Sequence, residues 1–105
     1  MSYTLRFLPE VEEDALRAYE WYEGKAKGLG EEFLRVFYAS AYELQRNPQI
    51  YRIVYKNFRR CLTERFPYAI YYMVIEDQVI IYGLFHCARD PKFIKLEISD
   101  RKIDT

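Results

Sequence analysis

Basic residues cluster between positions 52 and 65 of the 105-residue chain. The cluster consists of Arg52, Lys56, Arg59, Arg60 and Arg65, with Glu64 as the one acid among them. Neighbouring residues of a strand point to opposite faces, so Arg59 and Arg60 cannot share one side, and one of them must face the open side of a sheet or a partner. A planar guanidinium can donate two parallel hydrogen bonds to a phosphate or carboxylate, which makes the cluster a candidate anion-binding site. The alternative is an ordinary solvated strand with ion pairs to helix acids.

His86 is the only histidine, and Arg89 and Asp90 follow it closely. An imidazole at a strand end can act as a general acid or base or can contact a phosphate, with Arg89 stabilising charge. The alternative is a structural histidine that bonds a turn carbonyl, beside a local pair of Arg89 and Asp90. Both interpretations stay open at this point.

Other side chains with possible chemistry indicate packing. Cys61 and Cys87 lack a CxxC motif and metal-ligand spacing, so we expect two buried structural thiols and no metal site. Four strand tyrosines could stack on bases, but a tyrosine-rich strand more often fills a core; they are Tyr68, Tyr71, Tyr72 and Tyr82. The sequence has no glycine-rich loop followed by Lys-Ser/Thr, no GxSxG elbow and no HExxH, which excludes the usual hydrolase, kinase and metalloenzyme classes. No cofactor is expected.

The first half of the chain predicts a strand and a helical hairpin. Residues 3–8 alternate as a short strand that stops at Pro9. A helix follows, with four carboxylates at its start (Glu10, Glu12, Glu13 and Asp14) and apolar residues at 3–4 spacing up to Ala26. Three glycines between 24 and 30 predict a tight connection, and a second helix runs from Glu31 to Asn47-Pro48.

The second half predicts a sheet for that hairpin to cover. Segments 51–55 and 58–63 are β-rich around a turn, and 68–75 and 79–85 form a hairpin of apolar strands. The order β-αα-β-β-β predicts a two-layer α+β domain with a helical hairpin on one face of an antiparallel sheet. We expect the first strand to lie alongside a later strand. The tail from Asp90 is expected to add a short helix or an edge strand and to fray at its end.

Length and composition limit the class of protein. A chain of 105 residues has room for a single domain, 1–105. The aromatic share of 18% and the net charge of zero exclude intrinsic disorder. Residues 1–51 carry 6 basic and 9 acidic groups (−3), and 52–105 carry 10 and 7 (+3). With no apolar stretch of membrane-spanning length and no visible signal peptide, a reducing cytoplasm is the expected location.

In combination these segments resemble the RelE/ParE family of toxins from bacterial toxin–antitoxin pairs. The resemblance spans almost the whole chain and rests on the order and spacing of several motifs. These are Gly28-Leu29-Gly30-Glu31-Glu32-Phe33, Asn47-Pro48, Arg59-Arg60, Arg65-Phe66-Pro67-Tyr68, Ile70-Tyr71-Tyr72 and His86-xx-Arg89-Asp90-Pro91. They look most like the ParE branch, often named plasmid stabilisation proteins, although Phe93 stands where that branch more often carries Trp.

The resemblance implies a RelE/ParE-like fold, a cognate antitoxin encoded beside the toxin, and one of two targets. ParE-like members inhibit DNA gyrase and arrest growth without known hydrolysis. RelE-like members cut mRNA on the ribosome with several Lys and Arg on the central strands and a C-terminal Tyr or His as the acid. The residues that would serve such a nuclease here are Arg60, Arg65, His86 and Arg89.

This chain departs from the nuclease pattern. No lysine lies between Asn57 and Pro91, and the last tyrosine, Tyr82, lies inside a predicted strand. We therefore predict a gyrase inhibitor that is not an enzyme, with no membrane association and no stable direct contact with nucleic acid. A RelE-like endonuclease and an inactive toxin-fold binding module are the alternatives. The residues expected to contact target or antitoxin are Arg59, Arg60, Arg65, His86, Arg89 and Phe93.

Overall fold

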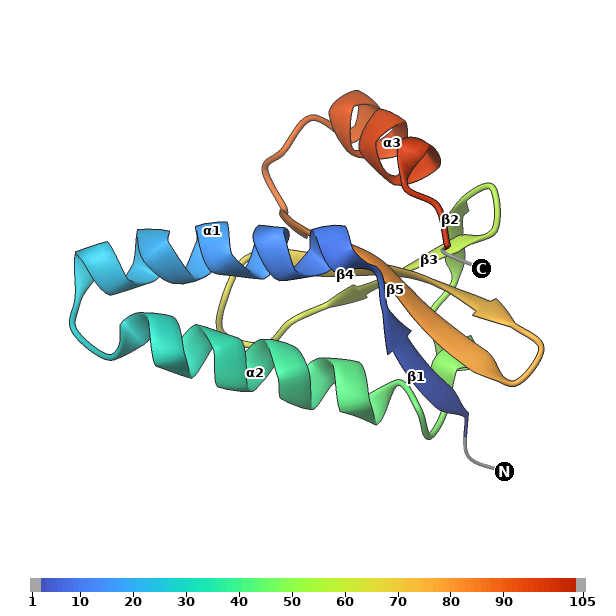
Figure 1. The fold of residues 1–105 in the computed structure, drawn as a ribbon, viewed down its shortest axis with the longest axis horizontal. Coiled ribbons are helices and arrows are strands. Elements are labelled where there is room, and N and C mark those ends of the chain that lie inside the picture. Colours follow the sequence, from blue (N-terminus) through green and yellow to red (C-terminus); the bar gives the residue numbers. More distant parts are fainter. Residues whose placement is uncertain (1–2, 104–105) are drawn as a thin grey trace.

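The computed structural model describes residues 3–103, which fold into five strands, three α-helices and one 3₁₀ turn (Figure 1). The elements are β1 Thr4–Phe7, α1 Pro9–Lys25, α2 Leu29–Glu43, the 3₁₀ turn Pro48–Ile50, β2 Ile53–Tyr55, β3 Phe58–Leu62, β4 Tyr68–Ile75, β5 Gln78–His86 and α3 Pro91–Asp100. The predicted order of a strand, a helical hairpin and then strands is confirmed, but four strands follow the hairpin, one more than the order β-αα-β-β-β counts. Of the two predicted alternatives for the tail, the helix is correct.

The sheet is mixed, with strand order β1-β5-β4-β3-β2. The last four strands pair antiparallel along the chain, as short turns require. β1 instead pairs parallel with β5, and Thr4 lies opposite Gln78. The expectation that the first strand lies beside a later one is confirmed, but the sheet is not antiparallel throughout. A helical crossover separates β1 from the other strands, and such a connection permits parallel pairing.

The turn between α1 and α2 is fixed by a carboxylate from α1. Glu23 accepts hydrogen bonds from the backbone N–H groups of Gly28 and Gly30, both at 2.9 Å. Gly28 has a φ of 86°, a left-handed conformation that favours glycine. A Cβ on Gly30 would lie 2.7 Å from the backbone oxygen of Tyr19, so the two helices approach closely here. The predicted glycine-rich connection therefore has a clear steric role.

Helices lie on both sides of the sheet (Figure 1). The α1–α2 hairpin covers the face that carries Tyr68, and the ring centroids of Tyr68 and Phe33 on α2 are 4.9 Å apart. α3 lies against the opposite face, where Phe93 meets Phe85 edge-on at 6.4 Å. The α+β class and the helical hairpin on one face are confirmed, but the fold is not strictly two-layered, because α3 covers part of the second face of the sheet.

The strand tyrosines mostly fill the core, as predicted. Tyr71, Tyr72 and Tyr82 are buried and Tyr68 is half-buried. The Tyr72 hydroxyl donates to the Pro48 carbonyl at 2.6 Å, and burial raises the pKa of this phenol. This bond ties the segment after α2 to the centre of the sheet.

No helix within residues 3–103 is long and apolar enough to cross a membrane.

Candidate functional site

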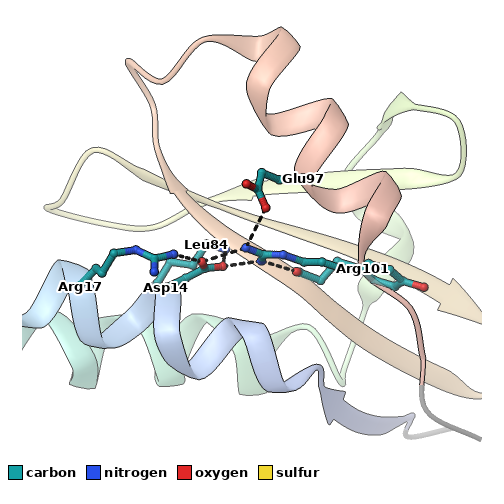
Figure 2. Close-up of polar contacts among 6 residues, drawn as sticks. Asp14, Arg17, Leu84, Glu97 and Arg101 are labelled. Carbon is teal, nitrogen blue, oxygen red and sulfur yellow. Dashed lines mark hydrogen bonds and ion pairs between the residues drawn. The ribbon is translucent and has the colours of Figure 1, made fainter.

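Two side chains take the place of a missing strand at the edge of β5 (Figure 2). The pairing of β1 with β5 stops at Ile81, so the backbone groups that follow need other partners. The Tyr82 carbonyl accepts from Arg101 Nη1 at 2.9 Å, and the Leu84 N–H donates to Asp14 Oδ2 at 3.1 Å. The buried backbone of this edge is thereby satisfied without another strand.

Asp14 and Arg101 also bind one another. Arg101 donates from Nη1 to Asp14 Oδ2 at 2.6 Å and from Nη2 to Oδ1 at 3.0 Å, and the two side chains are 7% and 1% exposed. Arg17 adds a bond to Asp14 at 2.8 Å, and Glu97 lies 3.7 Å from Arg101. Burial acts to lower the pKa of Arg101, but hydrogen bonds to Asp14 and the charges of Asp14 and Glu97 outweigh it and raise that pKa.

Neither partner was expected from the sequence to have this role. Asp14 counted only as one of four carboxylates near a helix start. A signal did exist, because Asp14 lies three residues after Val11 and four before Ala18, on the stripe that faces the core. A carboxylate on that stripe needs a buried cation. Nothing in the charged tail distinguished Arg101 as that cation.

A groove of about 470 Å³ lies beside this pair, at the end of β5; we call it the His86 groove. It runs between α1, the end of β5 and α3, and its lining includes His86, Arg89 and Phe93. The structure thus brings together three of the six residues expected to bind a target or antitoxin. Trp21 on α1 is exposed at the same groove.

The imidazole of His86 takes part in a turn. Its Nδ1 accepts a hydrogen bond from the Ala88 N–H at 2.9 Å, and its ring stands edge-on to Tyr68 at 5.2 Å. Since Nδ1 is an acceptor, the proton of the neutral ring is on Nε2. In this arrangement the Nδ1 lone pair is occupied by the turn. His86 thus takes part in a turn, as the structural interpretation held, but it accepts from a backbone N–H and was expected to bond a carbonyl.

Arg89 and Phe93 form a stacked pair on the wall of this groove. The guanidinium carbon of Arg89 lies 4.0 Å from the Phe93 ring centroid, which is a close cation–π contact. Arg89 is exposed, so its charge remains available to an anionic partner. The aromatic ring at position 93 therefore positions a cation at the groove.

A second groove, of about 460 Å³, lies between the β2–β3 hairpin and α3; we call it the Arg60 groove. Arg60 is exposed there, whereas Arg59 lies on the other face and donates to the carbonyls of Tyr51 at 2.6 Å and Gln49 at 3.3 Å. The expectation that the two arginines point to opposite faces is confirmed. Arg59 therefore holds backbone carbonyls, and Arg60 is the one that is exposed at a groove.

Arg65 lies apart from both grooves. It has a φ of 68° in the β3–β4 loop, pairs with Glu32 at 3.0 Å and lies over the Phe66 ring. The six candidate residues therefore occupy four separate places and do not form one site.

The two cysteines differ. Cys61 is buried, and that burial raises the pKa of its thiol. Cys87 is exposed, so the expectation that both thiols are buried is wrong for Cys87, which follows β5 where the chain leaves the sheet. Within residues 3–103, no group of three His, Cys, Asp or Glu side chains is arranged to hold a metal ion.

Comparison with known proteins gives a family and a fold. The model of the family described as the ParE toxin of the type II toxin–antitoxin system parDE matches residues 5–91. No curated protein sequence matches the chain. A solved structure of a chromosomal ParDE system from P. aeruginosa is 17% identical with a TM-score of 0.70, and the match covers 81% of this chain and 96% of that one.

Two further solved structures are similar. The toxin–antitoxin complex RelBE2 from Mycobacterium tuberculosis is 18% identical with a TM-score of 0.59, and the match covers 82% of this chain and 92% of that one. A double mutant of the toxin RelE from E. coli in the free state is 15% identical with a TM-score of 0.57, and the match covers 94% of this chain and 97% of that one. At these identities the structures show a shared fold.

Proposed function

Because this chain belongs to the ParE toxin family of type II toxin–antitoxin systems, we propose that it arrests growth by inhibiting DNA gyrase unless its antitoxin binds it. On this proposal the toxin acts in the cytoplasm by binding a protein target, and it needs no catalytic residue of its own.

The separation of the candidate nuclease residues carries this proposal. General acid–base cleavage requires its groups within hydrogen-bond reach of one reacting centre. Here Arg60 lines one groove, His86 and Arg89 line another, and Arg65 lies in neither. The Nδ1 lone pair of His86 is also occupied by the Ala88 N–H. This arrangement supports a binding function over hydrolysis.

An antitoxin encoded beside the toxin is the proposed regulatory partner. The outer side of the helical hairpin carries a third groove, of about 380 Å³, lined by Leu16, Tyr19, Leu34 and Tyr38 among others. Leu16 and, farther along α2, Tyr42 are more than half exposed. Exposed apolar side chains of this kind are typical of protein-binding surfaces. A short upstream reading frame whose product copurifies with this chain would support the partnership.

The decisive experiment is a supercoiling assay with purified gyrase, run beside a translation assay that detects mRNA cleavage. Inhibited supercoiling with intact mRNA is the expected result. Cleaved mRNA with unaffected gyrase would overturn the proposal in favour of the RelE-like alternative. Expression without growth arrest in a host with a matching gyrase would indicate an inactive binding module.

A further inference from the structure

The Arg60 groove presents three cations and no carboxylate. Arg52, Arg60 and Lys95 line it, all three are exposed, and the described lining includes no Asp or Glu. None of the three is in an ion pair within residues 3–103. The arginines that do pair with acids lie elsewhere and are Arg17, Arg46, Arg65 and Arg101. No ion pair among the described residues therefore neutralises the positive charge of this groove.

Three different elements bring these charges together. Arg60 comes from β3, Arg52 immediately precedes β2, and Lys95 comes from α3. Tyr55 on β2 also lines the groove, and its pKa is lowered first by a hydrogen bond with Ser99 and to a smaller extent by Lys56 and Lys95. The fold thus concentrates charge that the sequence distributes over more than forty positions.

The groove offers charge more than apolar surface. Of its described apolar lining, Ile94 and Ile98 on α3 and Tyr71 on β4 are buried, so that only Ile53 and Val54 on β2 add large exposed apolar side chains. Nucleic acids can meet such a surface through phosphates, which bind guanidinium forks and ammonium groups.

The aromatic rings of the groove are not free to stack on bases. The ring centroid of Tyr55 has the ammonium groups of Lys56 and Lys95 at 5.2 Å each, and its hydroxyl lies 3.3 Å from the Ser99 hydroxyl. Tyr71 is 8% exposed. Binding of single strands depends on open stacking surfaces, whereas a duplex presents its phosphates outward. The groove therefore suits a duplex backbone better than single-stranded RNA.

We propose that the Arg60 groove is a phosphate-binding surface for duplex DNA, through which the toxin contacts the DNA that gyrase holds. The gyrase part rests on the proposed function, but the DNA contact itself does not require gyrase. Contact through three cations is weak and sensitive to salt, so DNA alone does not retain the toxin stably.

The test is fluorescence anisotropy of a short labelled DNA duplex with the purified full chain over a range of salt concentrations. Three phosphate contacts predict that log Kd changes with log salt with a slope of about 2.7, which is about a 40-fold loss of affinity between 50 and 200 mM salt. The double variant Arg60→Gln/Lys95→Gln leaves one contact, and its slope is expected to fall to about 0.9. The control Lys27→Gln/Arg35→Gln removes the same charge at exposed positions outside the groove and is expected to keep the wild-type slope. Thermal unfolding of both variants checks that each retains its fold.

Equal slopes for the groove variant and the control would overturn the proposal. So would tighter binding of a single-stranded RNA of the same length. If the wild type shows no affinity for duplex DNA but the groove variant loses gyrase inhibition, the groove meets an acidic protein surface and the DNA proposal is wrong. Groove-dependent DNA binding without any effect on supercoiling would instead support the groove and refute gyrase as the target.

Discussion

Arg101 and Asp14, 87 positions apart in the chain, form a bidentate ion pair that also completes the hydrogen bonding of the β5 edge. One pair therefore connects α1, β5 and the segment after α3. Removing either member leaves a buried charge and an unpaired backbone group, which is more damaging than the loss of an exposed ion pair.

Arg101→Met is expected to lower the free energy of unfolding by about 3 kcal/mol or more, because Asp14 would stay buried without its main cation. Urea denaturation at neutral pH measures this as a lower midpoint at unchanged slope. The double variant Asp14→Leu/Arg101→Met is expected to recover part of the loss. A loss below about 1 kcal/mol for the single variant would show that the pair acts as an exposed one does.

Arg59→Ala is expected to cost about 1.5 kcal/mol of unfolding free energy, because the guanidinium holds the Tyr51 and Gln49 carbonyls. Arg60→Ala, one residue later and exposed, is the matched control and is expected to stay within about 0.5 kcal/mol of wild type. Chemical denaturation of the two variants side by side is the measurement. Equal losses would contradict the assigned orientations.

His86→Ala is expected to retain gyrase inhibition and growth arrest, because the imidazole takes part in a turn and is exposed. Its effect on stability is expected to lie within about 0.5 kcal/mol. Supercoiling inhibition and colony counts on induction measure the two activities. Loss of arrest in a folded His86→Ala protein would favour the nuclease alternative. Truncation before Asp90 is a poor substitute, since it removes α3 and Arg101 together and tests folding instead.

Alkaline pH is expected to destabilise the protein partly through Tyr72. Burial raises the pKa of this phenol in the folded state, so above its usual value of 10 the unfolded chain loses a proton that the folded chain keeps. The contribution of the Tyr72 phenol to the free energy of unfolding is therefore fully present below pH 10 and decreases as the pH rises further. The variant Tyr72→Phe removes the hydrogen bond to Pro48 and is expected to lower the free energy of unfolding by about 1 kcal/mol at neutral pH. It has no phenol at this position that could lose a proton at alkaline pH. Its stability is expected to approach that of wild type above pH 10, as measured by urea denaturation at several pH values. A constant gap across this range would contradict the assignment.

Local patterns in the sequence were sufficient to predict much of the fold. The apolar periodicity, the glycines near 24–30 and Asn47-Pro48 predicted both helices, and β-rich or continuously apolar segments around short turns predicted the antiparallel strands. The parallel pairing of β1 with β5 was not predictable, because a helical crossover leaves strand direction open. The partnership of Asp14 with Arg101 was also missed, since it depends on tertiary distance and has no local signal at Arg101.

Prediction of the candidate site was less complete for a similar reason. The opposite orientation of Arg59 and Arg60 followed from strand geometry, but which of them lines a groove depended on where α3 packs. Clustering in sequence suggested one basic site. In the fold, however, Arg65 pairs with Glu32 of the helical hairpin, and Lys95 lines the same groove as Arg60. His86, Arg89 and Phe93 do come together, because they follow one strand end.

The parallel pairing of Thr4 with Gln78 has a kinetic consequence. A nascent chain that ends before residue 78 offers β1 no sheet partner, while the apolar stripes of the α1–α2 hairpin are already synthesised. Closure of so long a loop is slow compared with formation of helices or of the β4–β5 hairpin. The toxin therefore passes through a period of synthesis in which its helical hairpin lacks a complete sheet, and its apolar stripes stay uncovered until β5 has been made.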